Sequence, residues 1–395
     1  MKLSDIRTHT YEVDMPRKMG DANSPRGRKR SSNVILELIT DEGLTGISTT
    51  GFSTIPFIKS MFNTVLINED PVQVRGLWKR MIEIAFKGGH YGVVNDAISA
   101  LDIALWDLKA KINNEPLWKT LGGLNPKVKS YASGIEMPLS DIDLKKWYES
   151  MAAMGFDGGK IKVGLNQDDD IRRIGIMKEA LSVNNPNPML LIDSNEYWSP
   201  KQAIRFIREI EEHFDITWAE EPARRWDFIG LKKISDSVKT AVCAGENIDT
   251  LGEFLPYFHH QSADIIQVSS GMGGITCALQ IADAAYGFDL PVTLGGSAGH
   301  LHAHLATSIP NFMIMEVSSE FPDPVLSTEI KFEDGNAILG NEPGIGFKIN
   351  WDKLEDLKTE NPSRVSGPSP YGRRAGAGLY QVKATSEEIK EAQEK

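Results

Sequence analysis

The sequence has little cysteine, no excess of positive charge and no long hydrophobic run, and each absence excludes a class of protein. Only two of its 395 residues are cysteines, Cys243 and Cys277, and they offer neither a disulfide framework nor a zinc-binding C-x-x-C pair. Lys and Arg total 43 against 54 Asp and Glu, and the net charge of −11 disfavours binding to nucleic-acid phosphates. No apolar run reaches the roughly 18 residues of a membrane span, and the N-terminus lacks a signal-peptide pattern. We therefore expect a cytoplasmic protein that binds neither nucleic acid nor membrane.

What is present is a chain of ordinary globular composition, 41% hydrophobic and 25% charged, in three regions. Residues 1–125 begin with strand-like segments and continue with a helical pattern over Asn95–Lys111, where Asn95 or Asp96 can cap the start. Residues 19–32 are rich in Gly, Ser, Pro and Arg and are expected to form a mobile loop. We expect the first region to be an α+β capping domain.

The last region, residues 326–395, has too few apolar residues for a core of its own. We expect it to pack back onto the N-terminal domain. A charged, helix-like tail over Ser386–Lys395 is expected to stay partly mobile.

Between these regions, residues 126–325 alternate short apolar strands with amphipathic helices. Strands are expected at 129–131, 158–163, 189–193, 216–220, 242–246, 265–268, 292–294 and 313–316. Eight strands, each followed by a helix or loop, are typical of a parallel α/β barrel. A doubly wound open sheet is the alternative, but the first strand–helix turn lacks the G-x-G-x-x-G fingerprint of that fold. The barrel is therefore favoured.

Polar residues end several of these strands, where barrel active sites are built. Asp193, Glu220 and Glu246 follow one another at spacings of 27 and 26 residues, one strand–helix unit each. Three carboxylates pointing into one barrel mouth would repel one another unless a cation lay between them, and an oxygen-only ligand set favours Mg²⁺ over zinc. The second strand ends in Lys160-Ile161-Lys162, whose spacing puts both ammonium groups on one face. Near a divalent cation the pKa of Lys162 would be lowered, as a general base requires.

An ordered set of motifs resembles the enolase superfamily, and within it the mandelate racemase and muconate lactonizing enzyme group. The motifs are ALDIALWDLKAK, EPLWKTLGG, GGKIKVG, LIDSNEYW, WAEEP, AGENID and GGIT. The resemblance implies a modified (β/α)₇β barrel of the TIM type, capped by an α+β domain built from both termini. It also implies a Mg²⁺ held by Asp193, Glu220 and Glu246, and removal of a proton α to a carboxylate.

Further roles follow from the same resemblance, position by position. Lys162 corresponds to the base, and Lys160 to a neighbour that lowers the pKa of Lys162 and helps to neutralise the substrate carboxylate. Asn195 corresponds to a residue of the metal shell or a hydrogen-bonding partner of the substrate. Glu316, at the end of the eighth strand, corresponds to an acidic residue that hydrogen-bonds the substrate carboxylate.

The chain departs from family members that carry a His–Asp dyad on the opposite face. Ser269 stands where those members have Asp, and no His follows the seventh strand directly. A two-base racemase would therefore lack its obvious second base. The next loop contains His300, His302 and His304, which can simply cap or pack the following helix. Alternatively, His300 or His302 enters the mouth and replaces the missing acid, and His300 is favoured because it lies nearer the strand end.

The loop expected to cover the mouth carries Arg26, Arg28, Lys29 and Arg30. In an acidic protein, such a cluster is either a solvated surface or a lid for an anionic, hydroxyl-rich substrate. We favour a sugar acid, with Arg26 as a binding residue, and dehydration as the reaction. Cycloisomerisation of an anhydro-sugar acid or lactone is the second choice, racemisation or epimerisation the third, and a catalytically silent sugar-acid binder stays open. A metal-dependent hydrolase barrel is disfavoured because the first strand offers no His-x-His. Family analogy suggests a homo-oligomer.

Overall fold

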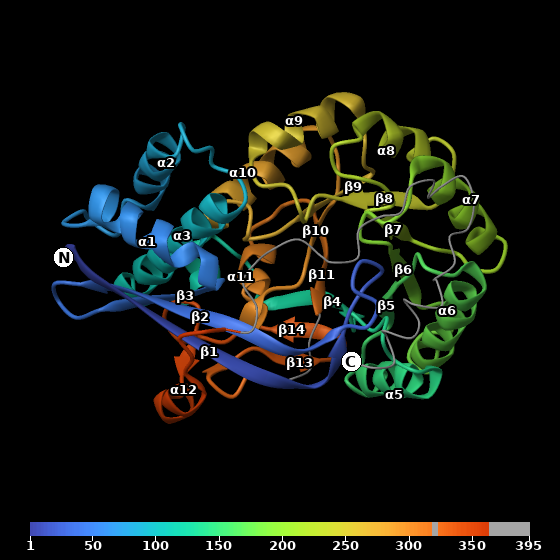
Figure 1. The fold of residues 1–395 in the computed structure, drawn as a ribbon, viewed down its shortest axis with the longest axis horizontal. Coiled ribbons are helices and arrows are strands. Elements are labelled where there is room, and N and C mark those ends of the chain that lie inside the picture. Colours follow the sequence, from blue (N-terminus) through green and yellow to red (C-terminus); the bar gives the residue numbers. More distant parts are fainter. Residues whose placement is uncertain (318–322, 363–395) are drawn as a thin grey trace.

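The computed structural model describes residues 1–317 and 323–362, and its centre is a closed barrel of eight parallel strands (Figure 1). Residues 363–395, which include the tail expected to be mobile, lie outside the described residues. The barrel strands are β4 (Lys127–Ser133), β5 (Gly158–Lys162), β6 (Met189–Asp193), β7 (Trp218–Glu220), β8 (Ala241–Ala244), β9 (Ile265–Val268), β10 (Val292–Leu294) and β11 (Phe312–Val317). Each pairs in parallel with its neighbour, and β11 pairs with β4 to close the ring. The predicted barrel is confirmed.

Helices follow the barrel strands and cover the outside of the ring (Figure 1). They are α5 (Asp141–Ala153), α6 (Gln167–Leu181), α7 (Pro200–Glu211), α8 (Phe228–Ser235), α9 (Leu251–His260), α10 (Gly274–Gly287) and α11 (His302–Ala306). Local sequence explains where several begin. At α6, for example, the Asn166 side chain accepts hydrogen bonds from the first-turn backbone, and three Asp residues fill that turn, where the helix dipole favours negative charge.

Side chains fill the interior of the barrel. The mouth of the barrel is therefore closed from below and does not continue into a channel. Six buried residues, each from a different barrel strand, form a cluster inside the ring: Tyr131, Leu191, Trp218, Cys243, Ile265 and Ile314. Strands covered on both faces must be apolar on both faces, which is why their sequences read as continuous hydrophobic runs. Most buried polar side chains of these strands therefore lie in their C-terminal halves, near the barrel mouth.

The N-terminal domain is an antiparallel sheet of β1 (Leu3–Met19), β2 (Arg28–Thr40) and β3 (Thr45–Thr50), packed against helices. These are α1 (Ile55–Met61), α2 (Val74–Ile84), α3 (Val93–Ile112) and α4 (Leu117–Thr120), together with a 3₁₀ turn at Phe52–Thr54 and a π turn at Phe62–Leu66. The prediction of a mobile loop over residues 19–32 is wrong in extent. Pairing of the two strands continues to Met19 opposite Arg28, so only Gly20–Gly27 form the connection.

Helix α3 anchors the N-terminal domain to the barrel. The Asp102 carboxylate accepts hydrogen bonds from the Thr276 backbone N–H (2.9 Å) and hydroxyl (2.6 Å), and Trp106 donates to the same hydroxyl (3.0 Å). The predicted cap at Asn95 or Asp96 is wrong, because the helix begins after Gly92, whose φ of 57° few other residues adopt. Asn95 is instead buried and donates to the Gly271 carbonyl (2.7 Å).

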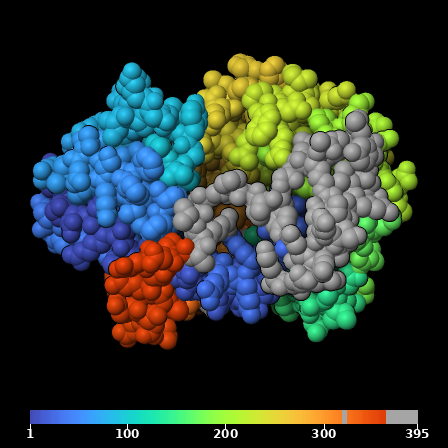
Figure 2. All heavy atoms as spheres, viewed as in Figure 1, coloured from blue at the N-terminus to red at the C-terminus, as the bar shows by residue number. Residues whose placement is uncertain are grey.

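The described part of the C-terminal segment contacts both the barrel and the N-terminal domain. A hairpin of β13 (Lys331–Glu333) and β14 (Asn336–Ile338) adds antiparallel to β4, and β12 (Leu326–Ser327) pairs with β15 (Lys348–Ile349). Helix α12 (Trp351–Leu357) lies against β1, and Figure 2 shows the red end of the described chain beside blue residues of the N-terminal region. The Tyr11 hydroxyl of β1 donates to Asp323 at 2.7 Å. No helix within the described ranges is long and apolar enough to cross a membrane.

Candidate active site

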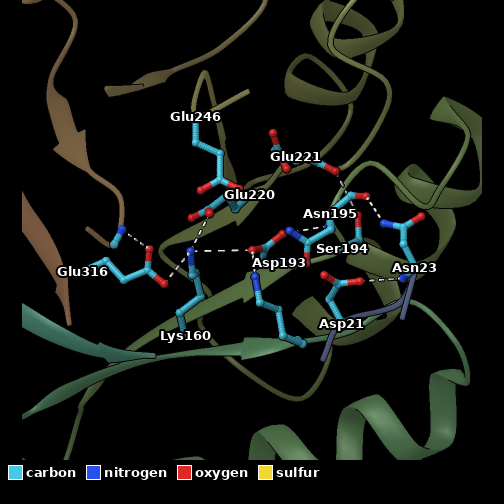
Figure 3. A network of polar contacts seen from close by, with 12 residues as sticks. Asp21, Asn23, Lys160, Asp193, Ser194, Asn195, Glu220, Glu221, Glu246 and Glu316 are labelled. Carbon is cyan, nitrogen blue, oxygen red and sulfur yellow. Dashed lines mark hydrogen bonds and ion pairs between the residues drawn. The ribbon is translucent and has the colours of Figure 1, made fainter. Parts of the chain in front are cut away.

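The charged strand ends predicted from the sequence meet at one mouth of the barrel (Figure 3). Lys162 of β5 lies level with Asp193 of β6, and Asp193 level with Glu220 of β7. Glu246 follows β8, and Glu316 lies near the end of β11. Parallel pairing in this register brings residues some 30 positions apart in sequence to one layer. Lys160, Asp193 and Glu220 are at most 1% exposed, so their charges must be compensated within the protein.

Two lysines supply this compensation. The Lys160 ammonium forms an ion pair with Glu220 and lies 3.4 Å from Glu316 Oε1 and 3.6 Å from Asp193 Oδ2. Lys162 pairs with Asp193. The Glu316 carboxylate also accepts a hydrogen bond from the Gly296 backbone at 2.8 Å. The structure therefore brings together both predicted lysines and the predicted carboxylates of β6, β7 and β11.

The buried carboxylates repel one another, and this repulsion shifts their pKa values. Burial raises the pKa of Glu220 to about 8, Lys160 opposes this rise, and the charges of Asp193, Glu246 and Glu316 reinforce it. Burial likewise raises the pKa of Glu246. For Asp193, burial is outweighed by Lys162 and Lys160, so its pKa is lowered. Together these carboxylates carry more negative charge than the two ammonium groups neutralise. Such an excess of buried negative charge is typical of a site that binds a cation.

The donor set fits a hard divalent cation. All its ligand atoms are carboxylate oxygens, which suit Mg²⁺. Two further buried oxygens beside it, Asn195 Oδ1 and Glu221 Oε2, have no hydrogen-bonding partner. Within residues 1–317 and 323–362, no three His, Cys, Asp or Glu side chains already lie close enough together to hold an ion. The ammonium groups of Lys160 and Lys162 pair with Glu220 and Asp193, so a cation held by Asp193, Glu220 and Glu246 would compete with the lysines for these carboxylates.

The pKa of Lys162 differs from the expectation. Burial lowers this pKa, but the ion pair with Asp193 outweighs burial, so the pKa lies above its ordinary value. The pKa of Lys162 was expected to be lowered by a nearby divalent cation. Such a cation would bind Asp193 and so weaken the ion pair between Asp193 and Lys162.

The loop Gly20–Gly27 reaches the site through Asn195. Asn195 has a φ of 45°, and its backbone N–H donates to Asp193 Oδ1 at 2.7 Å. Its carbonyl accepts a hydrogen bond from Asn23 of the loop, also at 2.7 Å. Arg26 lies half-buried in the same loop. Sequence reasoning missed Asn23, which no motif distinguishes, and Glu221, whose only signal is the doublet it forms with Glu220.

The three histidines after β10 are placed differently from the expectation. His302 is fully buried, its Nδ1 lies 2.6 Å from the Gly295 carbonyl, and its Nε2 accepts from the Ser270 backbone N–H at 2.8 Å. The same Nε2 lies 2.8 Å from the Ser270 hydroxyl, so both ring nitrogens have partners within the protein. The role of His302 in substrate binding stays a prediction. The His300 ring packs edge-on against Phe332, with ring centroids 4.8 Å apart. Its role as the acid stays a prediction. His304 is buried as well.

Comparison with known families agrees with this geometry. Residues 6–122 match the family described as mandelate racemase / muconate lactonizing enzyme, N-terminal domain, and residues 143–353 match the enolase C-terminal domain-like family. A 3,6-anhydro-alpha-L-galactonate cycloisomerase of Streptomyces coelicolor is 30% identical over 90% of this chain and 99% of its own. An L-talarate/galactarate dehydratase of Salmonella typhimurium is 31% identical over 72% of this chain and 71% of its own.

Solved structures extend the comparison. A racemase from Streptomyces coelicolor with bound magnesium superimposes with a TM-score of 0.83 at 28% identity, covering 90% of this chain and all of that one. The Salmonella typhimurium L-talarate/galactarate dehydratase, liganded with Mg and L-lyxarohydroxamate, gives 0.82 at 25% identity, covering 91% and 93%. The relatives thus include dehydratases, cycloisomerases and epimerases, so similarity identifies the kind of site and leaves the overall reaction open.

Proposed function

This chain belongs to the mandelate racemase/muconate lactonizing enzyme family of the enolase superfamily, and on this premise we propose that it is a Mg²⁺-dependent enzyme that removes the proton α to the carboxylate of a sugar acid. One observation carries the proposal: two lysines of β5 lie buried in ion pairs with the carboxylates that end the neighbouring strands. Asp193, Glu220 and Glu246 would hold the metal. When bound, Mg²⁺ supplies positive charge that stabilises the negative charge developing on the substrate carboxylate.

The two lysines have different roles: one neutralises the substrate carboxylate and the other removes the α-proton. Lys160 is fully buried, and its carboxylate partners outweigh burial and raise its pKa, so it stays charged and can neutralise the substrate carboxylate. Lys162 lies nearer the mouth, at 6% exposure, and takes the α-proton at Nζ. To act as a base it must first lose its own proton, which requires that its pairing with Asp193 be relieved.

Dehydration is the favoured overall reaction, because one base and one acid suffice for it. Lys162 removes the α-proton, and a proton from a group near His300 accompanies loss of the β-hydroxyl. Cycloisomerisation needs the same parts, and the similarity to the anhydro-galactonate cycloisomerase over nearly its whole length supports it as the second candidate.

α-Proton exchange tests the proposal. The protein is incubated with Mg²⁺ in D₂O against pentonates, hexonates, aldarates, their lactones and anhydro-sugar acids, and NMR records deuterium uptake and products. A 2-keto-3-deoxy product identifies a dehydratase, and ring opening with deuterium uptake identifies a cycloisomerase. Exchange should disappear in Lys162→Ala and persist in Lys201→Ala, a control in the exposed part of α7. Absence of exchange across the panel, or exchange that survives in Lys162→Ala, would refute the proposal.

A further inference from the structure

The side of the barrel mouth facing the lysines contains a polar group that the proposed mechanism does not use. In the closed ring, β9 lies four strands from β5, directly across the mouth. Gln267 of β9 is fully buried there, and neither its Oε1 nor its Nε2 has a hydrogen-bonding partner. A buried amide with both ends unpaired is costly to the folded protein, so this one calls for an explanation through function.

Gly295, the residue after β10, lies beside this amide and leaves room for a methyl group there. A Cβ atom built on Gly295 would lie 3.4 Å from Glu246 Oε2, 3.6 Å from Gln267 Nε2 and 3.8 Å from Glu316 Oε2. Polar atoms from three strand ends thus surround one point that no side chain fills. Gly295 is not among the glycines with positive φ, so backbone conformation does not require glycine at this position.

This space is held rigidly by its surroundings. The Gly295 carbonyl lies 2.6 Å from His302 Nδ1, and the Gly296 N–H donates to Glu316 at 2.8 Å. Gln267 and Thr293 are paired in the β9–β10 ladder, and the Thr293 hydroxyl donates to the Ile314 carbonyl at 2.7 Å. The Gly295 backbone and the Glu316 carboxylate beside this space are therefore held in place by hydrogen bonds within the protein.

We propose that Gln267 and the space at Gly295 form a subsite for a substrate hydroxyl, on the face of the substrate turned away from Lys162. An amide offers one acceptor and one donor side by side, and a hydroxyl can satisfy both at once. A hydroxyl suits this amide better than a carboxylate does, because a carboxylate only accepts and would leave Gln267 Oε1 without a donor. The inference rests on the proposed function, and it assigns Gln267 as a specificity-determining residue for a hydroxyl at or next to the reacting carbon.

Paired ligands and two variants test this subsite. Binding of pentonates and hexonates, and of their 2-deoxy and 3-deoxy counterparts, is measured by calorimetry with Mg²⁺ for the wild type, Gln267→Leu and Gly295→Ala. Loss of a buried hydrogen bond to a hydroxyl weakens binding about 10- to 100-fold. We expect that loss in Gln267→Leu for the hydroxy acid, and little change for the deoxy acid that lacks the recognised hydroxyl. Gly295→Ala fills the space with contacts no closer than 3.4 Å, so it should keep the wild-type melting temperature and show the same selective loss.

The outcomes separate this inference from the function beneath it. A purely structural role of Gln267 would weaken hydroxy and deoxy acids equally, and that result would overturn the subsite. Wild-type affinity of every hydroxy acid in both variants would also overturn it, while α-proton exchange by the wild type would leave the proposed function intact. If the wild type exchanges the α-proton of no acid, the proposed function is refuted. The subsite is then refuted as well, because it rests on that function.

Discussion

Acid should destabilise this protein through its buried histidines, and His302 allows the effect to be worked out. Its Nε2 accepts a hydrogen bond from the Ser270 backbone N–H, so this nitrogen must be unprotonated, and the proton lies on Nδ1 facing the Gly295 carbonyl. Protonation of Nε2 would break the hydrogen bond from the Ser270 backbone and place a positive charge on a fully buried ring. Burial accordingly lowers the pKa of His302 from 6.5 to about 4.

The sign and size of the effect follow by linkage. Between pH 6.5 and pH 4 the unfolded chain binds a proton at His302 that the folded chain does not, so stability is complete above pH 6.5 and is lost as the pH falls. One pKa unit corresponds to about 1.4 kcal/mol, so the free energy of unfolding falls by about 2 kcal/mol at pH 5 and about 3 kcal/mol below pH 4. Burial also lowers the pKa values of His300 and His304 to about 4, which adds effects of the same sign.

The assay compares the wild type with His302→Gln by urea unfolding, followed by tryptophan fluorescence, at pH 8, 7, 6 and 5. Glutamine can still donate toward Gly295 and accept from Ser270 but does not titrate. The loss of stability from pH 8 to pH 5 should be about 2 kcal/mol smaller in the variant. The comparison cancels groups of opposite sign, such as Asp102, whose pKa burial raises to about 7. The exposed His213→Gln variant should behave like the wild type. Equal losses in the wild type and His302→Gln would refute the reasoning.

Two further predictions concern the domain interface and the metal. Gly274→Ala should destabilise the protein by about 3 kcal/mol or more, because its φ is +83° and a Cβ would lie 2.4 Å from Asp102 Oδ2. Gly287→Ala, with nothing within 4 Å, should be neutral or slightly stabilising in the same denaturation assay, and similar losses in both variants would contradict this account. Glu220→Gln keeps the side-chain shape but removes a charge from the proposed metal site, so Mg²⁺ affinity measured by calorimetry should fall at least about tenfold. The exposed Glu209→Gln serves as control, and unchanged affinity in Glu220→Gln would remove Glu220 from the ligand set.

Much of the fold was predictable because its signals are local. Each barrel strand is a short apolar run between polar helices, and this pattern depends only on neighbouring residues. The spacing from Asp193 to Glu220 to Glu246 repeats that unit, so their place at one barrel end could be inferred without coordinates. The prediction failed where tertiary contacts outweigh local composition. The polar stretch 19–32 has the composition of a loop, yet its two ends, Met19 and residues 28–32, are held in strands by pairing between β1 and β2.

The sequence by itself therefore determined the barrel, the family and the lysines and carboxylates of its mouth, since these follow from period, spacing and motif. Tertiary structure decided what each polar atom meets. It engaged both nitrogens of His302 with backbone, brought Asn23 to Asn195, raised the pKa of Lys162 through Asp193, and left the Gln267 amide unpaired beside Gly295. These outcomes depend on groups far apart along the chain, whose distances of a few ångströms no local pattern encodes.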